Sequence, residues 1–148
     1  MNRDLFLFKT GVKVRTFEID SQGIVHNLIY FKYFEIGRME YRRNLGYTVM
    51  RDGTFNDGMK VVVVHNSIDY KSFGFLDDDL DVYTRISWIK NSSFCFEQFI
   101  ENPKTGDLIC EGRGILVNIN PSTNLPEKLE DKFLAEIKNF ERKLEVLR

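Results

Sequence analysis

The chain has 148 residues and a formal net charge of −1, with 43% hydrophobic and 29% charged residues. This composition is that of a globular rather than a disordered protein, and the length suits one domain with its own hydrophobic core. The near-neutral charge supplies no general basic field for nucleic acid, and no run of about 18 apolar residues indicates a membrane span. We therefore expect a single domain over residues 1–148, with its core at about 5–125, no nucleic-acid partner and no membrane span.

The two cysteines, Cys95 and Cys110, are too few for a disulfide framework or a cysteine-rich zinc site. We expect both to be reduced thiols in the core. The segment 1–4 places an acid ahead of a short apolar run and lacks a small-residue cleavage site, which is unlike a signal peptide. A cytoplasmic location follows as a prediction. No metal site and no cofactor are expected, and the acidic run 77–79 indicates the entry to a hairpin.

The first half of the chain predicts a strand, a turn and a long helix. Residues 12–19 are extended in character, and 20–23 is a cluster of turn formers. From about residue 28 to 45 the hydrophobic period becomes helical, with Asn27 as the expected N-cap and Gly46 as the left-handed residue after the helix. Gly37 costs helix stability, so its place on the apolar stripe predicts a close approach of the helix to a sheet.

The second half predicts four consecutive strands and a final helix. The strands are expected at 61–70, 80–90, 94–100 and 108–119. The first of them begins with four valines, which suits burial on both faces, and His65 within it is expected to pack as a strand residue. The second alternates, with Leu80 and Trp88 on the same side. Gly112 and Gly114 predict a bulge in the last strand, and apolar spacing predicts a helix at about 126–147. This order favours an α+β fold with the long helix laid across an antiparallel sheet.

Three segments carry a family resemblance. The first is Asp20-Ser21-Gln22-Gly23-Ile24-Val25-His26-Asn27, followed by Tyr30 and by Tyr33-Phe34-Glu35-Ile36-Gly37-Arg38-Met39-Glu40. The others are Asp69-Tyr70 with Asp78-Asp79-Leu80, and Ser92-Ser93-Phe94. Over about residues 12–125 the chain resembles the hotdog-fold thioesterases, specifically the 4-hydroxybenzoyl-CoA thioesterase-like family. The resemblance implies a curved sheet wrapped around a central helix, a homodimer or tetramer, and hydrolysis of an acyl thioester of coenzyme A (CoA) or acyl-carrier protein.

By the same resemblance, Asp20 occupies the position of the catalytic carboxylate, as nucleophile or as general base on water. The backbone N–H of Asn27 then polarises the thioester carbonyl. Elementary electrostatics agrees, because free N–H groups in the first turn of a helix favour an oxygen that gains negative charge. His26 could orient water or contact the substrate, since imidazole titrates near neutral pH.

Glu35 is a competing carboxylate. A second class of hotdog thioesterases carries its catalytic acid on the central helix, eight residues after the helix-start donor, as Glu35 follows Asn27. These two residues would lie about 12 Å apart along one helix, so Glu35 could join the site only from a partner subunit. Alternatively, Glu35 forms ion pairs with Lys32 and Arg38, three residues away on either side.

Substrate contacts are expected from two groups of residues. Tyr30, Val62 and Val64 would shape the acyl pocket, and Lys90, Ser92 and Ser93 would meet the phosphates of CoA, assisted by Arg113 or Lys71. Two other functions remain open. A hotdog dehydratase acting on 3-hydroxyacyl thioesters would need a His paired with a carboxylate, and His26 is the candidate. A non-catalytic module would bind acyl-CoA without releasing thiol.

Overall fold

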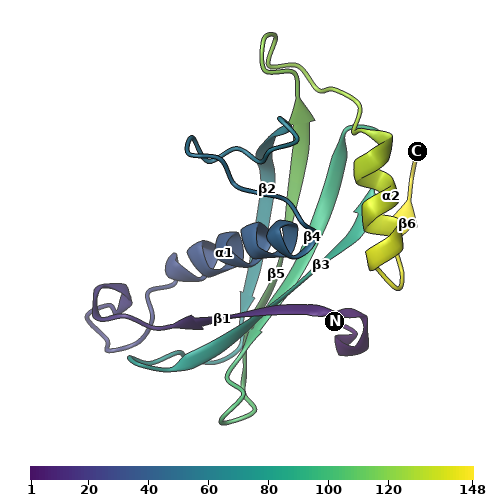
Figure 1. Ribbon diagram of the computed structural model, residues 1–148. Helices are drawn as coiled ribbons and strands as arrows, with labels where there is room; N and C mark the ends of the chain where they lie inside the picture. Colours follow the sequence, from purple (N-terminus) through teal and green to yellow (C-terminus); the bar gives the residue numbers. More distant parts are fainter.

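One six-stranded sheet curls around a long helix in the computed structural model, which describes residues 1–148 (Figure 1). The strands are β1 (Phe8–Lys13), β2 (Lys60–Tyr70), β3 (Asp79–Ile89), β4 (Ser93–Glu101), β5 (Leu108–Ile119) and β6 (Glu145–Val146). The helices are α1 (Ile29–Asn44) and α2 (Asp131–Phe140), with short 3-10 helices η1 (Arg3–Leu5) and η2 (Thr16–Glu18). The order across the sheet is β1-β3-β4-β5-β2, with every pair antiparallel except the short parallel pair of β6 with β3. The predicted α+β architecture is confirmed.

The buried face of α1 packs on the concave side of the sheet. Tyr33, Phe34 and Tyr41 on this face are at most 1% exposed. Gly37 lies between them, and a Cβ built there would approach Thr84 Oγ1 to 2.7 Å and Gln98 Nε2 to 2.8 Å. The close approach predicted for Gly37 is therefore confirmed, because no other residue fits between the helix and the sheet without displacing a neighbour.

The glycines of β5 serve the same contact, and the bulge predicted there is wrong. A Cβ at Gly112 would lie 2.3 Å from the Ser67 carbonyl oxygen of β2 and 2.8 Å from Cε2 of Phe34, and a Cβ at Gly114 would lie 2.1 Å from Nη2 of Arg38. Both glycines keep regular register, and the irregularities lie elsewhere, between Val63 and His65 of β2 and at Ile109 of β5, opposite the step from Ile100 to Glu101. Gly112 and Gly114 make room for side chains of α1 instead of bending their own strand.

Strand β2 forms one edge of the sheet, so the prediction that its valines are buried on both faces is wrong. It pairs only with β5, and Val63 and Val64 are 50% and 58% exposed. His65 is likewise exposed rather than packed. A run of apolar residues indicates that a strand needs to be covered by other protein. No other part of this chain covers the exposed valines of β2.

Three other elements differ from the sequence-based expectation. Strand β1 begins earlier than predicted, and η2 occupies part of the expected strand. A register shift between Ile86 and Trp88 in β3 reverses the alternation, so that Ile89 rather than Trp88 is fully buried. Helix α2 is shorter than expected because Glu141 takes an extended conformation, after which the chain turns back to add β6 beside β3.

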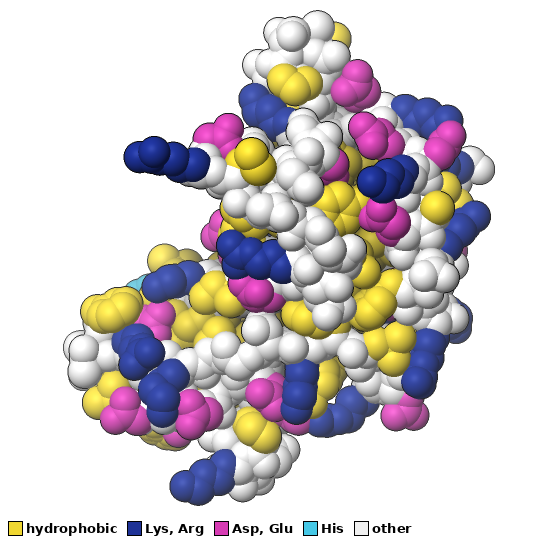
Figure 2. Space-filling view, viewed as in Figure 1, with side chains coloured by type: hydrophobic (Ala, Val, Ile, Leu, Met, Phe, Trp, Pro, Cys, Tyr) yellow, Lys and Arg dark blue, Asp and Glu magenta, His cyan; other side chains and the backbone are white.

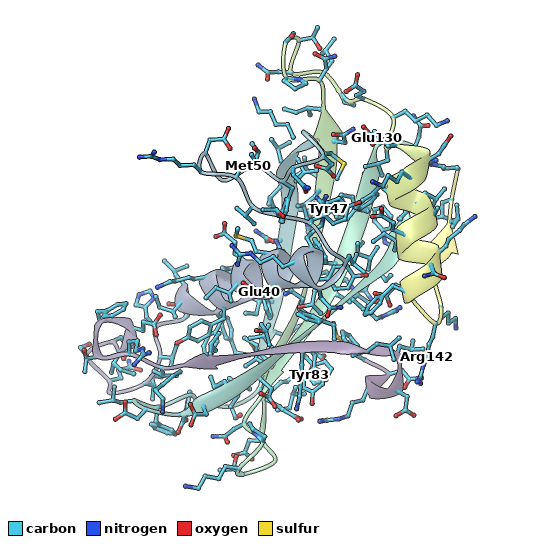
Figure 3. The ribbon with its side chains drawn as sticks, in the orientation of Figure 1. Glu40, Tyr47, Met50, Tyr83, Glu130 and Arg142 are labelled. Atoms are coloured by element: carbon cyan, nitrogen blue, oxygen red, sulfur yellow. The ribbon has the colours of Figure 1, made fainter.

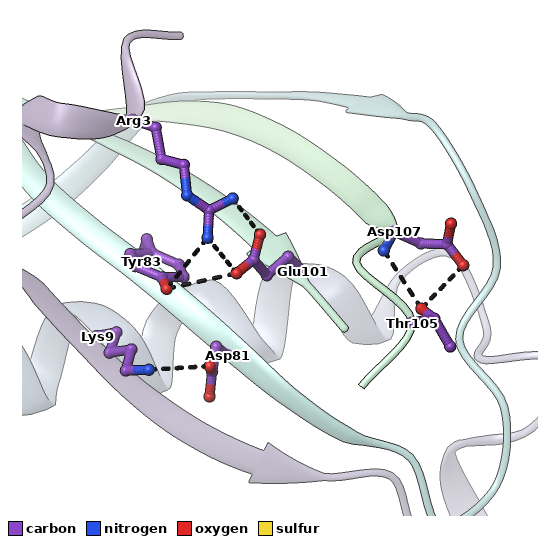
Figure 4. A network of polar contacts seen from close by, with 7 residues as sticks. All are labelled: Arg3, Lys9, Asp81, Tyr83, Glu101, Thr105 and Asp107. Atoms are coloured by element: carbon purple, nitrogen blue, oxygen red, sulfur yellow. Dashed lines mark hydrogen bonds and ion pairs between the residues drawn. The ribbon is translucent and has the colours of Figure 1, made fainter. Parts of the chain in front are cut away.

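A polar and aromatic network fixes the N-terminal segment to the outer face of the sheet (Figure 4). Arg3 donates to both carboxylate oxygens of Glu101 and lies over the ring of Tyr83, 5.3 Å from its centroid. Lys9 pairs with Asp81 at 3.2 Å. These contacts hold η1 and β1 in place, which in turn positions the segment that connects β1 to α1.

The structure tests two further expectations, the reduced state of the cysteines and the absence of a membrane-spanning helix. Cys95 and Cys110 are free and buried, as predicted, and burial raises the pKa of both thiols, so neither is an anionic nucleophile at neutral pH. Neither α1 nor α2 has the length and hydropathy that a bilayer crossing requires.

Candidate functional site

The connection from β1 to α1 is anchored by Glu18, a carboxylate that is only 3% exposed. It accepts hydrogen bonds from the Arg15 N–H at 2.9 Å and the Tyr33 hydroxyl at 2.9 Å, and it pairs with Lys32 at 3.2 Å. Burial by itself would raise the pKa of Glu18, but these bonds outweigh burial and lower it. The backbone carbonyl of Glu18 also accepts from the N–H of His26 at 2.9 Å. Glu18 thus fixes both ends of the loop that carries the candidate catalytic residues.

Asp20 lies in a tight turn closed by its own backbone. Its N–H donates to the Ile24 carbonyl at 2.9 Å, and its carbonyl accepts from the Gly23 N–H at 3.1 Å. Gly23 has a φ of 79°, a left-handed conformation that favours glycine. The Oδ1 atom of Asp20 accepts from the Gln22 N–H at 2.8 Å, whereas Oδ2 has no partner in the chain. The turn therefore presents one free carboxylate oxygen on a partly exposed side chain.

The start of α1 is organised by His26, not by the side chain of Asn27. Leu28 occupies the N-cap position, the Nδ1 atom of His26 accepts from the Leu28 N–H at 3.1 Å, and the His26 carbonyl accepts from the Ile29 N–H at 2.9 Å. The predicted N-cap role of Asn27 is therefore wrong. The Asn27 carbonyl accepts from the Tyr70 hydroxyl at 2.9 Å, while its N–H donates to no acceptor in the chain.

A groove of about 550 Å³ runs between α1 and the edge strand β2. Helix α1 lines it with Phe31, Lys32, Glu35, Arg38, Met39 and Arg42, and β2 lines it with Val61, Val63 and Asn66. The loop between α1 and β2, from which Tyr47 and Met50 are labelled in Figure 3, adds Gly53 and Phe55. Phe94, Phe96 and Leu116 complete the lining. In Figure 2, hydrophobic side chains are open to the surface in the middle of the face drawn, among charged ones.

Side-chain alternation decides which valines line this groove. Successive residues of a strand face opposite sides of the sheet, and Val61 and Val63 face α1. Val62 and Val64, the valines predicted to shape an acyl pocket, are exposed and are not part of the groove lining.

Glu35 stands in the groove without an ion pair. Lys32 pairs with Glu18 instead, and Arg38 donates to the amide oxygens of Gln98 at 2.8 Å and Asn66 at 3.0 Å. The alternative in which Glu35 is neutralised by Lys32 and Arg38 is therefore wrong. Glu35 is exposed on the groove wall and has no hydrogen-bond partner in the chain.

Of the other residues expected to contact substrate, Tyr30 is buried in the core and the β3–β4 turn lies far from Asn27. Tyr30 is 3% exposed within the core, and its hydroxyl accepts from the Gly74 N–H at 3.0 Å. Burial raises the pKa of Tyr30 to about 12. Lys90, Ser92 and Ser93 form the β3–β4 turn next to Val117, whereas Asn27 lies by Tyr70, whose strand partner is Cys110. Cys110 and Val117 are separated by about 23 Å along β5.

Sequence reasoning did not single out the part of the groove beyond Glu35. The sequence indicates Arg38 only through the family resemblance and as an ion-pair partner of Glu35, Phe94 only through the resemblance and as a strand residue, and Asn66 and Phe96 only as strand residues. The signal for Arg38 was Gly114, because a glycine in a strand indicates a close approach by another group. Arg113 and Lys71, proposed as phosphate contacts, pair with Glu97 and Glu111 at 3.3 Å and 4.0 Å.

Comparison with known proteins assigns the chain to a family. The family model of the Thioesterase-like superfamily matches residues 14–137, so the chain belongs to that superfamily. It is 26% identical over 132 residues to the Escherichia coli acyl-CoA thioester hydrolase YbgC, covering 89% of this chain and 96% of that protein. It is also 34% identical over 91 residues to the acyl-CoA thioesterase YbgC of Haemophilus influenzae, covering 62% of this chain and 66% of that protein.

Solved structures agree with the family assignment. A predicted thioesterase from Bacillus stearothermophilus superposes with a TM-score of 0.78 at 26% identity, covering 92% of this chain and 97% of that one. A 1,4-dihydroxy-2-naphthoyl-CoA thioesterase from Synechocystis superposes with a TM-score of 0.80 at 17% identity, covering 90% and 96%, which shows the shared fold. The expected hotdog fold and thioesterase family are confirmed.

Proposed function

We propose that the protein hydrolyses acyl-CoA thioesters, with Asp20 and the Asn27 N–H as the reacting groups. The observation that carries the proposal is the unused N–H of Asn27, one residue before the N-cap of the 16-residue helix α1. A backbone donor with a helix dipole behind it stabilises an oxygen that gains negative charge. The relatives that are named as acyl-CoA thioester hydrolases support the same reaction.

The chemistry follows from these two groups. The thioester oxygen accepts from the Asn27 N–H while the free oxygen of Asp20 removes a proton from water. Hydroxide adds to the carbonyl carbon, the tetrahedral intermediate collapses, the C–S bond breaks, and the thiolate takes the proton to give free acid and thiol. In the nucleophilic alternative, Asp20 itself attacks the carbonyl carbon, the C–S bond breaks and the thiolate leaves, and water then hydrolyses the resulting anhydride to the acid and free Asp20, giving a proton to the thiolate. His26, whose Nδ1 holds the helix start, carries its proton on Nε2 when neutral and can bind water or substrate there.

The groove between α1 and β2 is the proposed acyl pocket. Its β2 side is open, and we infer that a second copy of the chain covers it. The unpaired edge of β2 and its exposed valines are typical of a surface that a partner strand covers. We propose a dimer in which the two β2 edges face each other, so that the groove of one subunit meets the Asp20 turn of the other. Glu35 on the groove wall then lies within reach of the partner's substrate, and Lys90, Ser92 and Ser93 are candidate contacts for CoA across the assembly.

A panel of acyl-CoAs tests the proposed reaction. Purified protein should release free thiol from at least one short, long or aromatic acyl-CoA, and detection of the thiol by a chromogenic disulfide follows the rate directly. Glu35→Gln should keep most of this activity. A protein that binds acyl-CoA but never releases thiol would be the non-catalytic module instead. An acyl-carrier-protein thioester in the same assay decides between the two thiol carriers.

A dehydratase function has less support in the site. His26 is not ion-paired with any carboxylate of the chain, and its Nδ1 is occupied by the Leu28 N–H. Formation of an enoyl product from a 3-hydroxyacyl thioester, followed by its ultraviolet absorbance, would reveal that activity. A cytoplasmic location and a tetrameric state remain predictions.

A further inference from the structure

Arg38 is a half-buried cation in the groove with no acidic partner. Its Nε and Nη2 atoms donate to the neutral amide oxygens of Gln98 and Asn66, and no carboxylate lies within ion-pair distance. Burial lowers the pKa of Arg38 to about 10, and the nearby charge of Glu35 opposes this shift without cancelling it. Guanidinium has five N–H donors, and only two of those of Arg38 are used within the chain.

The neighbouring arginines of α1 are neutralised. Arg42 pairs with Asp57 and lies between the rings of Tyr47 and Phe55, 4.1 and 4.2 Å from their centroids. Arg43 is exposed and pairs with Glu40. Arg38 is therefore the exception on this helix, and buried charges in proteins are normally paired or bound to a ligand.

The position of Arg38 is fixed from the groove side by Asn66 and from the sheet side by Gln98, which does not line the groove. Gln98 is fully buried, and its amide nitrogen donates to the Phe34 carbonyl at 2.8 Å and to Thr84 Oγ1 at 2.9 Å. This leaves only the Gln98 oxygen to orient Arg38. On the other side, the missing side chain of Gly114 gives the guanidinium its space against β5. The cation is thus held ready before any ligand arrives.

From these contacts we propose that Arg38 binds a carboxylate at the far end of the acyl group, so that the preferred substrates are CoA thioesters of dicarboxylic acids. The inference rests on the proposed function and names the substrate class of the same site. Apolar side chains such as Phe31, Met39 and Phe96 line the groove around the methylene chain. A planar guanidinium with free donors matches a carboxylate in two hydrogen bonds.

Pairs of substrates with equal carbon number test this directly. Succinyl-, glutaryl-, adipyl- and suberyl-CoA are compared with butyryl-, pentanoyl-, hexanoyl- and octanoyl-CoA. For at least one length, kcat/KM should favour the dicarboxylic thioester by about tenfold or more, the size expected for a charge-assisted hydrogen-bonded pair. The ratio of the two kcat/KM values within one preparation does not depend on the fraction of active protein. It therefore reports substrate specificity separately from folding.

Substitutions then assign the preference to the side chain. Arg38→Met should abolish the preference, lowering kcat/KM for the dicarboxylic thioesters through KM by about tenfold more than for the plain acyl-CoAs of equal length, and Arg38→Lys should keep an intermediate preference. Arg43→Met is the matched control on the same helix and should behave like the wild-type protein. A wild type that prefers plain acyl chains at every length, or an Arg38→Met variant that keeps the preference, would overturn the proposal.

A binding measurement separates this inference from the proposed reaction. Free adipate or suberate should raise the Tm of the wild type and of Arg43→Met, but not of Arg38→Met, and hexanoate or octanoate should have no comparable effect. If no thioester is cleaved and dicarboxylates still stabilise through Arg38, the reaction is wrong and the site is right. If plain acyl-CoAs are cleaved and dicarboxylates have no effect in either assay, the site is wrong and the reaction is right.

Discussion

At the scale of single residues, the candidate site depends on side chains that hold the proposed reacting groups in place. Glu18 binds the backbone at Arg15 and His26 and the side chains of Tyr33 and Lys32. Asp20 lies in the loop between Arg15 and His26, and its own turn leaves one carboxylate oxygen free. The geometry of the proposed reacting groups is therefore set before substrate binds, which is what electrostatic stabilisation of a transition state requires.

The donor role of Asn27 predicts different effects of two substitutions at the same position. Asn27→Ala removes the side chain and keeps the N–H, so kcat should change little. Asn27→Pro removes the N–H, which no other group in the chain uses, and kcat should fall by about 100-fold to 1,000-fold. Steady-state kinetics on the best acyl-CoA, with the Tm of both variants as a folding control, makes the comparison. Equal activity of the two variants would rule out this donor.

The lowered pKa of Glu18 predicts acid sensitivity of the loop. Because the pKa is lower in the folded protein than its ordinary 4.5, Glu18 stabilises the fold above that pH and loses this contribution as the pH falls through the lower, folded value. The Tm of the wild type should therefore fall more steeply below about pH 4.5 than that of Glu18→Gln, which has no charge to lose. Parallel thermal unfolding curves between pH 7 and pH 3.5 measure the difference; superimposable pH profiles would exclude it.

At the scale of elements, α1 and the sheet pack closely because glycines lie at their contact. Gly37 on the helix and Gly112 and Gly114 on β5 each face a group that a Cβ would strike. This close packing places Arg38 across the groove and Phe34 in the core. The groove exists because α1 packs mainly against β3 and β1, on the far side of the sheet from β2, and leaves the β2 edge uncovered.

Gly37→Ala should lower the free energy of unfolding by about 1–3 kcal/mol, because the added methyl overpacks against Thr84, Gln98 and Val82. Gly11→Ala is the matched control, since its Cβ would meet only the Leu80 carbonyl at an ordinary 4.0 Å. Chemical denaturation of both variants gives the two values. A Gly37→Ala protein as stable as Gly11→Ala would mean that the helix can move away from the sheet without cost.

Elements with a strong local signal could be predicted from the sequence, and those defined by distant partners could not. The helical period and Gly46, with its φ of 97°, placed α1 to within about a residue. The N-cap was wrong because His26 supplies an acceptor through its ring nitrogen, a role that residue preferences assign to Asn27. The prediction that β2 is buried on both faces is wrong because hydrophobicity does not reveal whether the residues that cover a strand belong to the same chain. The free Asn27 N–H followed from the family resemblance and the helix position, whereas the uncompensated charge of Arg38 required the three-dimensional contacts of Gln98 and Asn66.

At the scale of the whole molecule, the central question is what covers the β2 edge. An 11-residue strand with one unpaired edge and exposed valines favours association with another strand. In a dimer built on this edge, the groove of one subunit and the Asp20 turn of the other form one site. Assembly and activity are then inseparable.

A substitution that introduces a charge on the edge strand β2 tests whether the dimer forms there. Light scattering should give twice the mass of one chain for the wild type, whereas Val64→Lys should shift it toward the monomer and lose activity in parallel. Val64 is the most exposed of the four valines, at 58%. Leu125→Lys, at a 64% exposed leucine outside β2, is the control and should remain dimeric and active. An active monomer would show that the site does not need a partner.

The most direct test of the whole account is the rate of thiol release by Asp20→Asn. Asparagine keeps the side-chain oxygen that accepts from the Gln22 N–H, so the turn and the Tm should be preserved. The amide cannot accept the proton from water, and kcat/KM for the best acyl-CoA should fall by about 100-fold to 10,000-fold. A folded Asp20→Asn protein that releases thiol at the wild-type rate would contradict the account.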